Sequence, residues 1–209
     1  MATFSVQPDG ASGIDARLNS GAATTNYGSL NVMVVGETVT DTTNYQSIGI
    51  IKFDLSSIPS TAIVTSASLY LTHVSKDASQ TRTMYVLRCL RDWTEAGVTW
   101  NKYDGVNNWG TSGGLNTSTD IDVVNVWGSR SISSSEADGE KEWTLSITEM
   151  QKFINGTYSN YGWFLTYNMT QFNDYHQWAS SDHATSSYRP RLVIEYTIPS
   201  GGSQAIWWS

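Results

Sequence analysis

Residues 66–72 read Ser-Ala-Ser-Leu-Tyr-Leu-Thr, and this stretch decides the fold class. Ala67, Leu69 and Leu71 alternate with Ser, Tyr and Thr at a period of two, which is the side-chain period of a β-strand. Ile63, further back along the chain, is expected to belong to the same apolar face. The stretch therefore predicts a strand with one buried and one solvated face.

The same period recurs elsewhere in the chain. Further strands are expected at 49–55, 84–90, 143–147, 163–167 and 192–196. Polar loops rich in Ser, Thr, Asn and Gly separate these runs, as they do in antiparallel proteins. About eight to ten strands predict an all-β, jelly-roll β-sandwich of two antiparallel sheets.

One short helix is expected between the strands. Thr148 and Gln151 have the spacing of a capping box, and an apolar stripe follows on one helical face. Asn155-Gly156 supplies a left-handed stop at its end. No Pro- or Gly-rich linker interrupts the sequence before residue 198, so residues 1–197 are predicted to form one domain.

Residues 198–209 are predicted to form a flexible C-terminal tail. A Pro-Ser-Gly-Gly-Ser spacer precedes Ile206, Trp207 and Trp208. Leaving these indoles in water forgoes about 1.5–3 kcal/mol of burial for each. The tail either folds back as a lid or docks on a neighbouring copy, and we favour docking because the spacer gives reach.

Charge and composition exclude several partners. The chain has 209 residues, a net charge of −7 and 15% charged residues. A nucleic-acid binder needs a basic stripe, which is lacking, and an anionic membrane surface is disfavoured for the same reason. The start has no basic and apolar signal pattern, and no apolar run approaches a membrane span.

Carboxylate pairs are the first candidates for catalysis. Asp92/Glu95 and Asp120/Asp122 have the residue types of a glycosidase acid and base, but no apolar slot that would raise a pKa is recognisable nearby. Fixing of loops by side-chain oxygens is the favoured interpretation. The three histidines are too scattered for a local metal motif, so no catalytic residue is assigned and the chain is predicted not to be an enzyme.

A structural calcium ion is the one cofactor considered. Asp15, Asp120 and Asp122 offer the carboxylate oxygens that calcium prefers, although their spacing matches no defined calcium loop. A solvated acidic face is the favoured alternative.

Aromatic side chains are the candidates for glycan binding, because sugar rings stack on flat exposed aromatics. The candidate residues are Trp109, Tyr103, Trp127 and Trp178. The alternative is that these rings plug the ends of the sandwich, since large aromatics are mostly buried. The tryptophans assigned to the core are Trp93, Trp100, Trp143 and Trp163.

Six blocks of the sequence occur in a characteristic order between Phe4 and Tyr196: 51–60, 67–71, 91–101, 160–163, 180–182 and 189–196. These blocks resemble the DNRLRE domains, also grouped as carbohydrate-binding module family 96. The six-letter string that names the domain does not occur. The resemblance implies a non-catalytic jelly-roll sandwich, usually part of secreted or surface proteins. Some members bind acidic polysaccharide, and stand-alone members are encoded by phages.

These observations lead to a main hypothesis and two alternatives. The main one is a structural or attachment protein on a phage head or tail, a decoration protein that forms homo-oligomers or contacts other virion proteins. The first alternative is a polysaccharide-binding module of a secreted carbohydrate-active enzyme. The remote alternative is a polysaccharide lyase or hydrolase. The expected location is the virion surface or the extracellular space.

Overall fold

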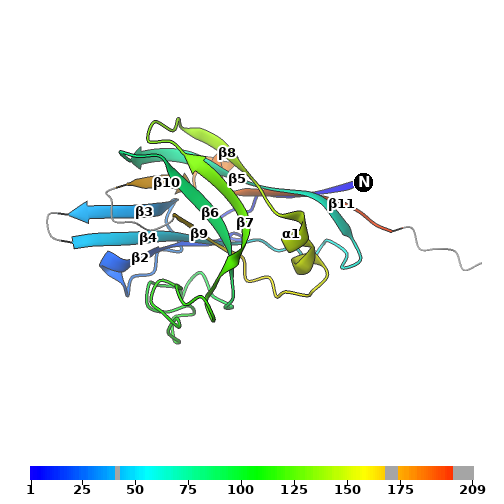
Figure 1. Ribbon diagram of the computed structural model, residues 1–209, viewed down its shortest axis with the longest axis horizontal. Coiled ribbons are helices and arrows are strands. Elements are labelled where there is room, and N and C mark those ends of the chain that lie inside the picture. The colour runs from blue at the N-terminus through cyan, green and yellow to red at the C-terminus, as the bar shows by residue number, and fades with distance from the viewer. Residues whose placement is uncertain (41–42, 168–173, 200–209) are drawn as a thin grey trace, which may run out of the picture.

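The computed structural model describes residues 1–40, 43–167 and 174–199, and it is almost entirely β-structure (Figure 1). One α-helix, α1 (Ile147–Ile154), and two short 3-10 helices, Ser20–Ala22 and Ser186–Tyr188, interrupt the strands. The strands are β1 (Ala2–Val6), β2 (Ile14–Asn19), β3 (Val32–Thr40), β4 (Thr43–Lys52), β5 (Ile63–Asp77), β6 (Arg82–Cys89), β7 (Ile121–Ile132), β8 (Gly139–Thr144), β9 (Trp163–Tyr167), β10 (Tyr175–Ala179) and β11 (Arg191–Thr197).

All strand pairs are antiparallel and belong to one hydrogen-bonded sheet. Its path is β1-β11-β5-β10-β3-β4-β9-β6-β7, with β2 added to β4 and β8 added to β5. The sheet curls, so that the indole N–H of Trp143 on β8 donates to the Met84 carbonyl on β6 at 3.3 Å. The predicted all-β sandwich is therefore confirmed, and its two layers are joined by strand pairing rather than separate.

Strand β5 confirms the alternation that decides the fold, with one correction. Ala67, Leu69 and Leu71 are buried, but Ile63 is 52% exposed and its neighbour Val64 points inward. The pairing of β11 with β5 shifts register after Glu195, and an extra residue in one strand reverses the faces. The prediction for Ile63 was wrong because sequence alternation does not reveal a bulge.

Two clusters of buried apolar side chains hold the fold together. The larger lies inside the curled sheet and contains Trp143 and Trp163. The smaller lies between the sheet face around Ile48, Ile50 and Phe164 and the chain segment that joins β6 to β7. Trp93 and Trp100 belong to this second cluster, so the four tryptophans assigned to the core are confirmed.

Helix α1 begins two residues earlier than the capping box predicted. Its N-cap is Ser146, whose hydroxyl accepts the Glu149 N–H at 3.3 Å. The Gln151 side chain instead bridges to the β5 entry, accepting from the Val64 N–H and donating to the Ala62 carbonyl, both at 2.9 Å. Thr148 is thus not the cap, because the Gln151 amide is used by a neighbouring chain segment.

Candidate functional site

Residues 90–120, here called the loop layer, cover the second core cluster and carry the candidate site. The layer is tied to the N-terminal region by a bond from the Asn101 N–H to the Ala23 carbonyl at 3.1 Å. The Asn26 amide adds bonds to the Glu95 and Val98 carbonyls at 2.6 and 2.7 Å. These backbone contacts hold an irregular segment in one conformation.

Asp120 organises the second half of the loop layer. Its carboxylate accepts the N–H groups of Gly110 and Thr111 at 3.0 Å, that of Asn116 at 3.3 Å, and the Arg91 Nε at 3.0 Å. Burial alone would raise the pKa of this carboxyl, but those hydrogen bonds hold the pKa below its ordinary value. Asp120 is therefore a backbone anchor whose oxygens already have protein donors.

The other two calcium candidates also have protein partners. Asp122 accepts from Arg88 and from the Val124 N–H, both at 3.1 Å, while Asp15 accepts from the Ser181 N–H at 2.8 Å. Burial raises the pKa of Asp15 to about 7. Among the described residues, no three His, Cys, Asp or Glu side chains are grouped so as to hold a metal ion. Structural calcium stays a prediction.

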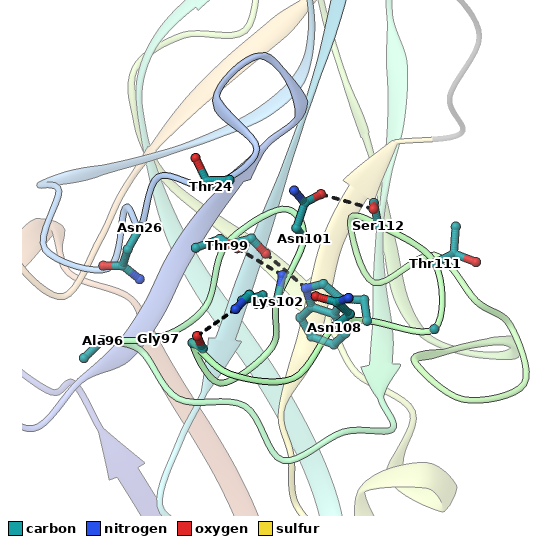
Figure 2. A pocket seen from close by; sticks show the side chains of 13 residues that line it. Thr24, Asn26, Ala96, Gly97, Thr99, Asn101, Lys102, Asn108, Thr111 and Ser112 are labelled. Atoms are coloured by element: carbon teal, nitrogen blue, oxygen red, sulfur yellow. Dashed lines mark hydrogen bonds between the residues drawn. The ribbon is translucent and has the colours of Figure 1, made fainter.

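The loop layer and residues 24–26 enclose a cavity of about 870 Å³, here called the polar pocket. Most of the side chains lining it end in an amide or a hydroxyl. Figure 2 shows Thr24, Asn101 and Thr111 spaced around it, with Asn108 and Lys102 between them. The lining residues are Thr24, Asn26, Ala96, Gly97, Thr99, Asn101, Lys102, Gly105, Asn108, Trp109, Gly110, Thr111 and Ser112.

Part of this polar lining is already engaged by the protein. Asn101 accepts from the Ser112 hydroxyl at 3.2 Å (Figure 2), and the Lys102 ammonium donates to the Gly105 carbonyl at 3.3 Å. The Thr99 hydroxyl accepts the Lys102 N–H at 3.0 Å. These contacts shape the wall of the pocket and orient its single cation.

Three lining side chains have unused hydrogen-bonding capacity. Thr24, Asn108 and Thr111 are exposed, and their side chains have no hydrogen-bond partner within the described residues. Together they offer two hydroxyls and one amide, each able to donate and to accept. The pocket is therefore suited to a ligand with many hydroxyl groups.

Trp109 supports the pocket rather than forming an open platform. Its ring is only 5% exposed and packs between Tyr103 and Phe164, with ring centroids 5.6 and 5.7 Å away. Its indole N–H donates to the Thr99 carbonyl at 3.0 Å. A flat sugar face cannot stack on a covered ring, so the expected stacking role of Trp109 is corrected. Tyr103 is partly buried and lies outside the pocket lining, and its glycan contact stays a prediction.

Trp127 and Trp178 are also unavailable for stacking. Trp127 lies in β7, not in a loop, and its centroid is 4.4 Å from that of Phe153 in the interior. Trp178 lies in β10 and packs against Trp143 at 5.2 Å. Both rings are at most 1% exposed and belong to the larger core cluster, so they are buried, as the alternative expected, but in the interior and not at the ends of the sandwich.

The residues weighed for catalysis do not meet at the pocket. Glu95 accepts the Asp15 N–H at 3.0 Å and so fixes the loop, as expected. Exposed Asp92 instead pairs with Lys52 at 3.4 Å and accepts no backbone N–H within the described residues. No Asp, Glu or His is among the described residues that line the polar pocket. A glycosidase needs two carboxyl groups across its substrate, and this pocket supplies none.

Two histidines that are distant in sequence meet in the interior. Nε2 of His73 lies 3.0 Å from Nδ1 of His176, and Nδ1 of His73 lies 3.0 Å from the Asp138 carboxylate. Burial lowers the pKa of His176 to about 4, so both rings are neutral at neutral pH. The pair lines neither the polar pocket nor any other described cavity and therefore belongs to the core.

Sequence reasoning missed most of the polar pocket. It singled out Trp109 in the stretch Asn107-Asn-Trp-Gly110, but not Asn108 beside it, and it passed over Thr24 and Thr111. The available signal was the density of amides and hydroxyls in residues 99–112. The tail residues Ile206, Trp207 and Trp208 lie outside the described residues, and no helix among the described residues is long and apolar enough to cross a membrane.

Comparison with known proteins agrees with this picture. A search of curated proteins found no match to the chain. The family model of carbohydrate-binding module family 96 matches residues 10–152, which is more than half of the chain and includes every residue lining the polar pocket. The match supports the resemblance in blocks 51–101, whereas the blocks at 160–196 lie beyond it. This chain belongs to carbohydrate-binding module family 96.

Proposed function

We propose that the polar pocket binds a polysaccharide and that the protein is a non-catalytic glycan-binding module. The observation that carries this proposal is the set of Thr24, Asn108 and Thr111 side chains around a cavity of about 870 Å³, which are exposed and have no hydrogen-bond partner in the part of the chain that the structure describes. Hydroxyl-rich ligands need donors and acceptors placed together on a rigid wall. Membership of a carbohydrate-binding family supports the same function.

Rigidity of the pocket supports binding of a sugar chain. Asp120 fixes the backbone at Gly110 and Thr111, and the Trp109 N–H donates to the Asn101 carbonyl at 3.1 Å. A wall that is ordered before binding loses less conformational entropy when the ligand arrives. Preorganised hydrogen bonds therefore take the place of the aromatic stacking that the buried Trp109 ring cannot provide.

The charge of the pocket favours glycans that carry carboxylate groups. Lys102 is the only charged side chain among the described residues that line it, and its ammonium keeps protons that Gly105 does not use. A uronate carboxylate would form a charge-assisted hydrogen bond with Lys102. We therefore expect tighter binding to an anionic polysaccharide than to a neutral one of similar length.

Isothermal titration calorimetry with a polysaccharide panel tests this function. The full chain is titrated with a neutral glucan, a polyuronate and a sulfated polysaccharide. The double variant Asn108→Ala/Thr111→Ala is expected to lose most of the affinity, and Lys102→Gln to lose affinity for the two anionic polysaccharides but not for the neutral glucan. Ser118→Ala, an exposed hydroxyl in the same loop layer but outside the pocket, is the matched control.

Two results would contradict the proposal. One is that no polysaccharide in the panel binds. The other is that the double variant binds as tightly as the control, which would place the glycan elsewhere on the molecule. An unchanged unfolding curve for each variant shows that the comparison reports binding and not folding.

Attachment to a virus particle is the finer hypothesis drawn from the sequence, and it stays a prediction. The family match supports carbohydrate binding rather than a place on a virion. A glycan-binding module acts outside the cell or on a surface, and either setting is compatible with secretion or with display on a particle. Negative-stain microscopy of particles labelled with an antibody to the chain would test the virion location.

A further inference from the structure

A second cavity differs from the polar pocket in chemistry. It has a volume of about 550 Å³ and lies on the outer face of β6 and β7, beside β9. We call it the apolar groove, and its apolar and aromatic lining residues are Tyr85, Leu87, Leu115, Ile121, Val123, Val126 and Tyr167. Gln46 and Thr166 add polar groups, and none of the described residues that line the groove carries a charge.

The groove leaves apolar surface in water. Val123 is 44% exposed and Val126 is 42% exposed, and both lie on β7 next to the still more exposed Val124. Valines are usually buried, and a contiguous exposed apolar patch marks a place where another molecule docks. An uncharged, apolar occupant would gain most from this surface.

The chain itself contains a segment of matching chemistry. Ile206, Trp207 and Trp208 follow a flexible spacer, and residues 198–209 contain no charged side chain. Large aromatic anchors seated in an apolar pocket are the usual energetic centres of protein interfaces. Neither the segment nor the groove would have to desolvate a charged side chain when they meet.

Strand register places the Gln46 end of the groove far from the end of β11. Thr197 pairs with Ile63 at the start of β5, whereas the other end of β5, at Asp77, pairs through β10 and β3 to Ser47 on β4. Gln46, beside Ser47, lines the groove. The strand between Ile63 and Asp77 has a length of about 46 Å at about 3.3 Å per residue.

The reach of the segment is smaller than that length. Trp207 is ten residues beyond Thr197, which corresponds to at most about 35 Å of fully extended chain. The segment would also have to pass from the layer containing β11 to the outer face of β6 and β7. Figure 1 shows that β11 ends at the opposite side of the molecule from the end of β3 and the start of β4. The groove that it fits is therefore that of a second copy.

We propose that Ile206, Trp207 and Trp208 of one copy dock in the apolar groove of a second copy. Each copy then offers one segment and one groove, so a reciprocal exchange closes a two-fold dimer and leaves no groove open. The partner of the groove is thus a second copy of this chain. This interaction is independent of the glycan function assigned to the polar pocket.

Complementation between two variants tests the exchange directly. Trp207→Ala/Trp208→Ala keeps the groove but lacks the anchors, whereas Val123→Asp/Val126→Asp keeps the anchors but has a charged groove. Sedimentation equilibrium of the full-length wild type is expected to show a dimer. For each variant alone, the dissociation constant of the dimer should rise about tenfold or more. Their equimolar mixture should recover association, because one intact contact forms between them.

Val106→Asp, which charges an exposed valine outside the groove, is the control and should dimerise like the wild type. A monomeric wild type overturns the proposal. So does a groove variant that associates normally, or a mixture that recovers nothing. If the groove variant loses polysaccharide binding while its association is unchanged, the occupant is a glycan and the proposal is also wrong.

Discussion

The polar pocket and the apolar groove share one stretch of chain and differ in almost everything else. Thr111 and Ser112 line the pocket, and Leu115, three residues later, lines the groove. The pocket is built by an irregular loop layer whose backbone is fixed by hydrogen bonds, whereas the groove is formed mainly by the strands β6, β7 and β9, with Leu115 of the loop layer at its edge. The difference shows how one fold can offer a hydroxyl-rich ligand and an apolar side chain separate surfaces.

The comparison also shows where the aromatic residues are used. Trp109 lies beneath the pocket, and Trp127 and Trp178 lie in the main core, so none presents a free face to solvent. Recognition at the pocket therefore depends on preorganised hydrogen bonds. The groove instead offers exposed valine side chains, whose contribution depends on removing them from water.

The largest effect is expected from removing the anchor of the loop layer. Asp120→Ala leaves the N–H groups of Gly110, Thr111 and Asn116 without their acceptor and Arg91 without its partner. We expect a loss of about 5 kcal/mol in the free energy of unfolding. Urea denaturation followed by tryptophan fluorescence measures it.

Asp104→Ala is the matched control for that experiment. Asp104 also accepts backbone N–H groups in the loop layer, those of Val106 and Asn107, but it does so at the surface. Its removal should destabilise the protein far less than removal of Asp120. Equal losses would mean that the loop layer has no single anchor and that the pocket wall is not built as described.

The second largest effect is a pH dependence at Asp15, beneath the loop layer. Burial raises the pKa of this carboxyl from 3.8 to about 7, and the nearby carboxylates of Glu95 and Asp182 add to the shift. Between pH 3.8 and about pH 7, the folded protein therefore holds a proton on Asp15 that the unfolded chain has lost. The free energy of unfolding falls as the pH rises through this range and does not change further above it because of this group. The loss from this group is about 4 kcal/mol.

Asp15→Asn isolates this contribution, because the amide does not titrate. The difference in unfolding free energy between the variant and the wild type should grow in favour of the variant from pH 4 to pH 7. Chemical denaturation at each pH measures that difference, while the other carboxylates cancel. A difference that is constant with pH would show that Asp15 is ionised in the folded protein.

A moderate effect is expected at the pocket itself. Asn108→Ala should weaken polysaccharide binding about tenfold, because one or two hydrogen bonds to the ligand are lost. Stability should not change, since the Asn108 side chain is exposed and has no protein partner within the described residues. Calorimetric titration measures the affinity. If this variant bound the polysaccharide with wild-type affinity, the ligand would not contact Asn108, and the binding site would lie away from the centre of the pocket.

The smallest effects are expected when a substitution in one surface is tested for its effect on binding at the other surface. Val126→Asp in the groove should change polysaccharide affinity less than about twofold, a difference below 0.5 kcal/mol. Asn108→Ala should leave self-association unchanged. Paired calorimetry and sedimentation measure both quantities. A coupled loss in either direction would show that the pocket and the groove form one continuous site.

Period-two patterns predicted the strands β4, β5, β6, β8, β9 and β11, because alternation reports burial of one sheet face directly, but they did not predict β1, β2, β3, β7 or β10. The strand expected at 143–147 ends at Thr144, and Ile147 begins α1. Strand β5 and the core positions of Trp143 and Trp163 followed from that signal. It failed at Ile63, where a shift in strand register changes which side chains point inward. Trp127 was instead expected in a loop, because β7, which contains it, was not predicted. A bulge depends on the partner strand, which a single sequence does not specify.

The polar pocket was largely beyond sequence reasoning for a related reason. Its walls join residues near Thr24 with residues 96–112, which no periodic pattern connects. Amides and hydroxyls are common in every loop of this chain, so Asn108 and Thr111 do not differ by residue type from many solvated positions. What distinguishes them is that Asp120 fixes the backbone beneath them.

Chemical-shift mapping tests the central claim most directly. The ¹⁵N-labelled full chain is titrated with the tightest polysaccharide of the panel, and the amide resonances are followed. The account predicts that the largest shifts cluster at Thr24, Lys102, Asn108 and Thr111, with Val123 and Val126 unaffected. Shifts concentrated at β6 and β7, or scattered without a centre, would contradict it.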